Sequence, residues 1–144
     1  MSVQNDLTMG LAAELLQALE KPSPGQEQIA RLNSALARIE RALARRLTDF
    51  TDEVEPDADH HRALLPSPGL ERRARGLRDN LADILRTVRT LRAEVAISPP
   101  SATDSSAASL NARLRDLVQT LERHEHGEID LVQAGMTTDI GAGD

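Results

Sequence analysis

Apolar side chains recur every three or four residues along four stretches of the chain, at residues 5–20, 29–54, 70–95 and 109–136. This spacing places them on one face of an α-helix, so each stretch predicts an amphipathic helix. Proline and glycine separate the stretches at residues 21–25, 55–69 and 98–100. These residues favour breaks, because proline disrupts a helix interior and glycine weakens it.

Four such helices joined by short connections predict an all-α fold, an up-down-up-down four-helix bundle that forms a single domain over residues 1–144. Asn5 or Asp6 is the expected cap of the first helix. A flexible linker is expected at about 97–108, and glycines near the end predict a helix cap and a tail at about 138–144. Because the first helix is short, a three-helix bundle with that helix loosely docked is the alternative. One Phe and no Trp or Tyr disfavour a β-sandwich.

Net charge and hydropathy restrict the classes of partner. The net charge is −6, which gives the chain no general attraction to nucleic acid or to an anionic membrane. No apolar run approaches the roughly 20 residues that cross a bilayer, and the first residues lack the basic segment of a signal peptide, so a cytoplasmic location is expected. Lys21 is the only lysine among 17 basic residues, a bias that suggests a bacterial genome rich in G and C. Arginines interleaved with acids along the third helix predict a solvated, ion-paired face rather than a phosphate-binding surface.

The last helix contains the candidate chemistry. Leu114, Leu117 and Leu121 follow the three-and-four spacing, and the same spacing continues to His124 and Glu128. Side chains one turn apart on one face can share a ligand. A carboxylate directed into a helical core must be paired, protonated or bound to a metal. The pattern therefore predicts half of a metal site.

Two other interpretations of this cluster remain open. The cluster could lie at the solvated end of the bundle, where carboxylates reach water. Alternatively, Glu125, Ile129 and Val132 continue the apolar stripe along its other edge, so a small rotation of the helix would expose His124. A second group of ligand-type residues follows the second helix, in an acidic joint whose simplest interpretation is an exposed loop. It comprises His60, His61, Asp57 and Asp59.

The C-terminal sequence resembles a known family. The segments Leu121-Glu122-Arg123-His124, Asp130-Leu131-Val132-Gln133-Ala134 and Asp139-Ile140-Gly141-Ala142-Gly143-Asp144 resemble the final helix and tail of bacterial hemerythrin-like (HHE cation-binding) domain proteins. A weaker similarity extends back to about residue 32, through 52–57 and 77–81. The resemblance implies a four-helix bundle in which histidines and carboxylates from all four helices hold a non-haem di-iron centre that binds or senses oxygen.

Several metal ligands implied by this resemblance are missing from the chain. His124 matches the histidine of the fourth helix, and Glu128 supplies a carboxylate one turn on. Asn80 stands where the third helix would bring a histidine, and the first helix has none. A complete site of that kind needs more histidines than the four in this chain, so an oxygen-carrying di-iron centre is not expected.

The expected protein is therefore a hemerythrin-like bundle with a degenerate metal site, acting as a non-catalytic binding or regulatory module with no firmly assigned cofactor. His124 and Glu128 are the candidate metal ligands, and their donor atoms suit iron or another divalent transition metal. One alternative is a non-haem iron sensor of oxygen or redox state that recruits His60, His61 or Asp57. Another is a scaffold for a helical protein partner, which an exposed apolar stripe on the first helix would indicate.

Overall fold

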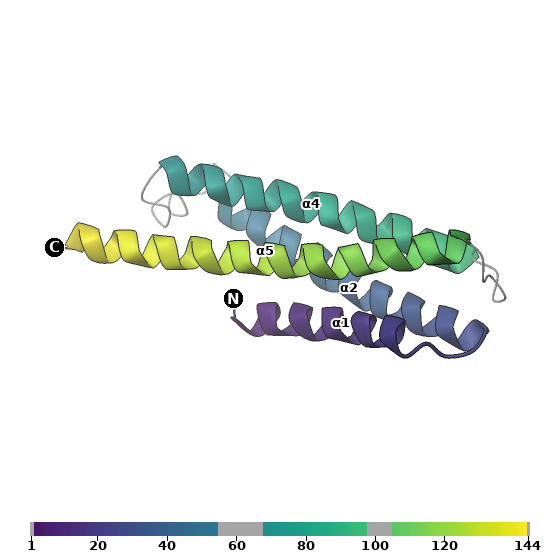
Figure 1. The fold of residues 1–144 in the computed structure, drawn as a ribbon. Helices are drawn as coiled ribbons and strands as arrows, with labels where there is room; N and C mark the ends of the chain where they lie inside the picture. The colour runs from purple at the N-terminus through teal and green to yellow at the C-terminus, as the bar shows by residue number, and fades with distance from the viewer. Residues whose placement is uncertain (1, 55–67, 98–104, 144) are drawn as a thin grey trace.

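The computed structural model describes the backbone of residues 2–54, 68–97 and 105–143, and side chains within 9–49, 69–97 and 107–134. It contains four helices, α1 (Ser2–Glu20), α2 (Gln26–Val54), α4 (Pro68–Ile97) and α5 (Ser105–Gly143), which run side by side (Figure 1). The predicted all-α four-helix bundle is confirmed. No described helix combines the length and the hydropathy that a bilayer span requires.

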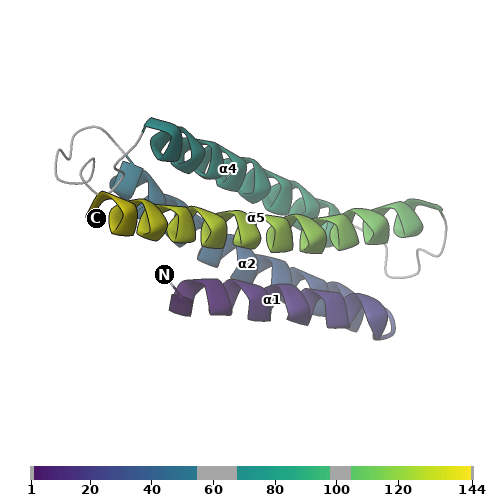
Figure 2. The same cartoon turned by 60° about the vertical axis from the view of Figure 1, so that its left-hand side comes forward.

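Successive helices alternate in direction, which is the predicted up-down-up-down order (Figures 1 and 2). α2 packs against α1 and α4, and α5 packs against the same two helices. Among the described residues α2 and α5 share no backbone contacts, so they lie diagonally across the bundle. This diagonal relation determines how side chains from α2 and α5 meet in the centre.

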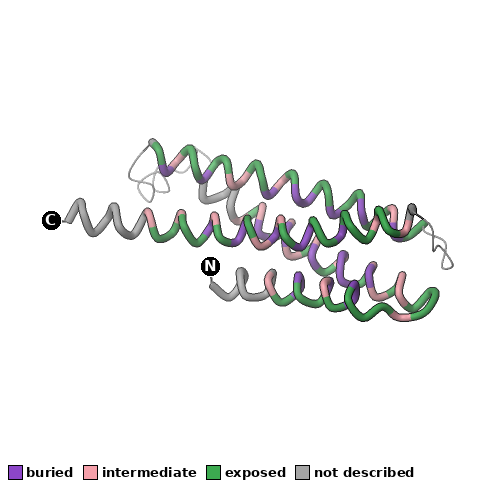
Figure 3. Tube along the Cα trace, viewed as in Figure 1, coloured by how far each residue is buried: buried purple, intermediate pink, exposed green. Residues whose placement is uncertain are grey.

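The core consists of the inward faces of all four helices (Figure 3). In α1, Leu11 and Leu15 are buried against the other helices, so the alternative of a loosely docked first helix is wrong. Full burial of a leucine side chain is worth roughly 1.5–3 kcal/mol, which makes these inward faces the main source of stability. The largest fully buried side chains are Leu15, Leu36, Ile39, Leu43, Leu81, Leu91, Leu114, Leu121, Val88 and Val95.

The first interhelical joint lies where proline and glycine predict it. α1 ends at Glu20, and α2 begins at Gln26. Gly25 has a φ of 59°, in the left-handed region that favours glycine. The Gln28 side chain accepts a hydrogen bond from the Ser23 N–H at 2.9 Å and donates one to the Ala18 carbonyl at 2.9 Å. This side chain therefore ties the end of α1 to the start of α2.

Three predicted boundaries differ from the structure. α1 begins at Ser2 rather than at a cap on Asn5 or Asp6. α5 begins at Ser105, so only residues 98–104 of the predicted linker lie between helices, and these are outside the described residues. α5 also continues to Gly143, where a tail from 138 was expected. α5 can extend this far because no proline follows residue 100 and because a glycine within a helix lowers stability by only about 1 kcal/mol relative to alanine.

Ion pairs along α4 bear out the predicted solvated face. Arg75 pairs with Glu71 and Arg86 with Asp83 on the helix itself, at N–O distances of 3.2 and 3.1 Å. Arg92 reaches Glu40 on α2 at 3.0 Å. Such exposed pairs contribute little to stability, about 0–1 kcal/mol each. With the pairs of Arg78 and Arg89, they give most of the arginines of α4 an acidic partner.

Candidate functional site

α5 turns a polar cluster toward the interior of the bundle. His124 is 5% exposed and Glu128 2% exposed, as the leucine spacing predicts. Glu125 is also buried, whereas Ile129 and Val132 are 39% and 40% exposed. The alternative rotation that would expose His124 is therefore wrong, and so is the interpretation that Glu128 lies at a solvated end. The structure thus brings together both predicted metal-site residues.

Glu128 is paired with an arginine from the diagonally opposite helix. The Arg46 side chain extends from α2, and its Nη2 donates to Glu128 Oε2 at 2.6 Å. Its Nε donates to the same oxygen at 3.2 Å, so the guanidinium contacts the carboxylate through two nitrogens. The Arg46 side chain is only 6% exposed. Such a charge-assisted, two-nitrogen contact is the strong form of an arginine–carboxylate pair.

His124 connects this ion pair to α4. Its Nε2 lies 2.7 Å from Glu128 Oε1, and its Nδ1 lies 3.1 Å from the amide nitrogen of Asn80. An amide nitrogen only donates, so Nδ1 accepts from Asn80 and Nε2 carries the proton that it donates to Glu128. A neutral imidazole fits this arrangement. The result is one continuous hydrogen-bonded chain, Asn80–His124–Glu128–Arg46, from three helices. Its last three members are buried and Asn80 is exposed, and we call it the buried polar chain.

The environment of Glu128 favours the ionised carboxylate. Burial raises the pKa of Glu128, but the hydrogen bonds from His124 and Arg46 and the charge of Arg46 outweigh it, so the net pKa lies below the ordinary value. Glu128 is thus an anion inside the bundle at neutral pH. The positive charge that balances the Glu128 carboxylate is the guanidinium of Arg46.

The lowered pKa predicts how stability changes with pH. Because folding lowers the pKa of Glu128, its ionised form stabilises the fold above its unfolded value, and this contribution is lost as pH falls through the folded value. We expect the difference in unfolding free energy between the parent protein and Glu128→Gln to be present at neutral pH and to shrink below about pH 4. Urea unfolding at a series of pH values measures this difference. Glu71→Gln, which removes a carboxylate from an exposed ion pair, is the control, and a difference that grows toward low pH contradicts the prediction.

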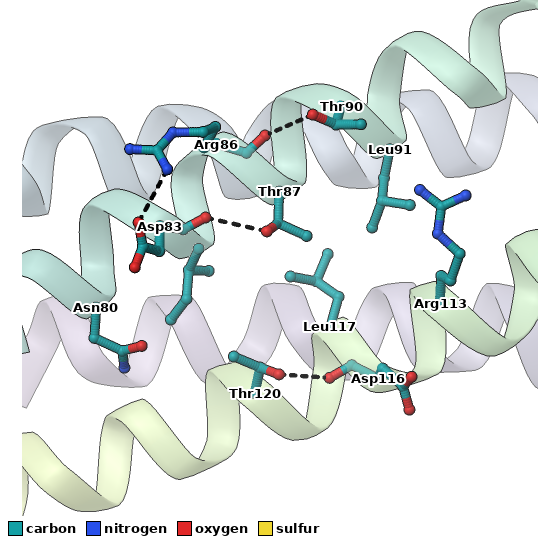
Figure 4. Close-up of a pocket in the computed structure, with 11 residues that line it drawn as sticks. Asn80, Asp83, Arg86, Thr87, Thr90, Leu91, Arg113, Asp116, Leu117 and Thr120 are labelled. Carbon is teal, nitrogen blue, oxygen red and sulfur yellow. Dashed lines mark hydrogen bonds and ion pairs between the residues drawn. The ribbon is translucent and has the colours of Figure 1, made fainter.

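Asn80 also lines an open groove between α4 and α5 (Figure 4). The groove has a volume of about 450 Å³, and its floor is formed by the buried Ile84, Leu91 and Leu117. Threonines line its sides, and each hydroxyl donates to a carbonyl one turn earlier on its own helix, such as Thr87 to Asp83 at 3.1 Å. Through Asn80 the buried polar chain therefore has one end at this groove.

The described donor atoms do not fit a di-iron centre. His124 and Glu128 supply two donors, and in the part of the chain that the structure describes no three His, Asp or Glu side chains converge as a metal-binding group. The guanidinium of Arg46 already neutralises Glu128, so a cation there would face electrostatic repulsion. Both ring nitrogens of His124 are engaged, so proton transfer to a substrate would first require breaking one of these bonds.

Arg46 is the functional-site residue that the sequence analysis missed. The apolar spacing of α2 runs through Leu36, Ile39 and Leu43, and three residues further falls on Arg46 rather than on the half-buried Leu47. An arginine at a position that the pattern assigns to the core was the available signal. The predicted second group of ligands, His60, His61, Asp57 and Asp59, lies outside the described residues.

Comparisons with known proteins do not place the chain in a family. No family model, curated protein or solved structure matches it.

Proposed function

We propose that this protein is a hemerythrin-like helical bundle with a degenerate metal site, working as a non-catalytic binding or regulatory module. The observation that supports this most is the ion pair between Arg46 and Glu128, with 2.6 Å between Nη2 and Oε2. In the family that the sequence resembles, carboxylates and histidines inside the bundle hold cations. Here a guanidinium from the same chain balances the carboxylate.

A buried positive charge next to the candidate ligands works against metal binding in two ways. It repels a divalent cation, and its own hydrogen bonds occupy the lone pairs of Glu128 that a metal would need. Removing Arg46 from Glu128 to admit a metal would also leave a guanidinium inside the bundle without its carboxylate. The buried polar chain is therefore best suited to a structural role, and the surface of the bundle is left for binding.

Metal analysis tests this proposal directly. We expect the purified protein to contain no stoichiometric transition metal, and its thermal unfolding midpoint to be unchanged when iron or zinc is added in excess. Elemental analysis and unfolding curves with and without each metal measure this, and Arg46→Met provides a comparison in which the repelling charge is absent. Stoichiometric iron that is lost in His124→Ala would contradict the proposal and favour the non-haem iron sensor instead.

A further inference from the structure

Three arginines form a line along the exposed side of α2 next to α1. Arg38, Arg41 and Arg45 are spaced by three and four residues, so they share one face over a length of about 10 Å. Together with Leu11 of α1 and Ala42 of α2 they line a groove of about 280 Å³. We call this the arginine groove. It lies outside the buried polar chain and takes no part in it.

Two of the three guanidiniums form no ion pair with a described side chain. Arg38 donates from Nη1 to both carboxylate oxygens of Glu14, at 2.8 and 2.9 Å. Arg41 and Arg45 have no carboxylate within ion-pair distance among the described residues, although the chain contains 23 acidic residues against 17 basic ones. On α4, by contrast, most arginines find an acid on the same or the next helix. Among the side chains that the structure describes, the arginine groove is therefore a local positive surface on an acidic protein.

The floor of the arginine groove is apolar, whereas its sides are charged. Leu11 is 4% exposed and Ala42 is half-buried, so the groove offers small apolar contacts between long cationic side chains. A ligand that fits must present negative charge at the sides and an apolar contact in the middle. Arginine binds planar carboxylates through two nitrogens, and its aliphatic part packs against apolar groups.

We propose that the arginine groove binds an acidic amphipathic helix of a partner protein. Carboxylates at positions i+3 and i+7 of such a helix match the spacing of Arg41 and Arg45, and a carboxylate at position i would compete with Glu14 for Arg38. An adjacent leucine would rest over Leu11 and Ala42. The proposal deepens the binding-module function above and rests on it. Nucleic acid fits less well, because the net charge is −6 and the chain has no Trp or Tyr for base stacking. An anionic membrane fits less well, because no large apolar side chain projects from the arginine groove to enter lipid.

The test uses the whole chain and a defined probe. The probe is a fluorescein-labelled synthetic helix of about 18 residues, with Glu at i, i+3 and i+7 on one face and leucines beside them. Its counterpart carries Lys at the same positions. Fluorescence anisotropy measures binding to the parent protein, to Arg41→Glu/Arg45→Glu, and to the matched control Arg72→Glu/Arg73→Glu. The control changes the net charge equally, at two exposed arginines of α4 that have no ion pair in the described part of the chain.

We expect the acidic helix to bind, the basic helix not to bind, and binding to weaken at least about tenfold in the groove variant, with less than about threefold change in the control. No binding at about 1 mM, or equal weakening in both variants, overturns the proposal. Groove-dependent binding to phosphatidylserine vesicles but not to the peptide would also overturn it and identify a lipid surface. The anisotropy measurements are made in a buffer without added metal, so peptide binding is measured independently of any metal site. Stoichiometric metal in the purified protein would therefore refute the proposed function and leave this binding result standing.

Discussion

Arg46→Met is expected to lower the free energy of unfolding by about 3–5 kcal/mol, because it leaves the Glu128 carboxylate inside the bundle without its countercharge. Glu128→Leu should destabilise by a similar amount, since it removes the carboxylate that pairs with the buried Arg46. The double variant Arg46→Met/Glu128→Leu should recover most of the loss, because an apolar pair of similar volume is often as stable as a buried ion pair. Urea unfolding of the four proteins completes a double-mutant cycle.

The matched control for this cycle is Arg38→Met. It breaks a contact in which the guanidinium again reaches a carboxylate at 2.8 Å, but the two side chains are 47% and 46% exposed. Exposed pairs of this kind are worth about 0–1 kcal/mol. If Arg46→Met cost no more than Arg38→Met, the Arg46–Glu128 pair would not be buried in solution, and Arg46 would not keep a metal from Glu128.

Leu15→Ala in α1 is expected to destabilise the protein by about 2–5 kcal/mol, because Leu15 is fully buried and its truncation leaves a cavity. Leu16→Ala is the neighbouring control, and its cost should be smaller because Leu16 is only partly buried. Urea unfolding with a comparison of m-values measures both effects. A small cost at Leu15 would mean that α1 packs loosely, which is the three-helix alternative considered from the sequence.

The helices were predictable because each local signal agrees with the packing. Pro22, Pro24 and Gly25 lie together in the joint between α1 and α2, and the leucine spacing identifies the inward face of every helix. The end of α5 was mispredicted for a physical reason. Glycine lowers helix stability only slightly and does not by itself end a helix. The glycines at 141 and 143 therefore lie within α5, where no proline interrupts the helix. Local sequence alone does not decide between a glycine cap and a helical glycine.

The candidate site was only half predictable. Periodicity placed His124 and Glu128 on the buried face, because it depends on one helix alone. Their partners come from other helices, and the sequence does not specify which residues of α2 and α4 lie at the same level. Asn80 stands where the resemblance implies a histidine, and it hydrogen-bonds to His124. The iron, the regulatory role and the helical partner remain predictions. Within residues 9–20 of α1, whose side chains the structure describes, no large apolar residue is exposed.

The ion pair between diagonal helices has a consequence for how the helices find their alignment. Leucine stripes of similar spacing can interlock at more than one axial offset, since sliding by a turn replaces one leucine by another. Sliding α5 by one turn relative to α2 would move Glu128 about 5.4 Å along the axis and break its ion pair with Arg46 inside the bundle. We infer that Arg46 and Glu128, 82 residues apart in the chain, single out one offset among several that hydrophobic packing alone would tolerate.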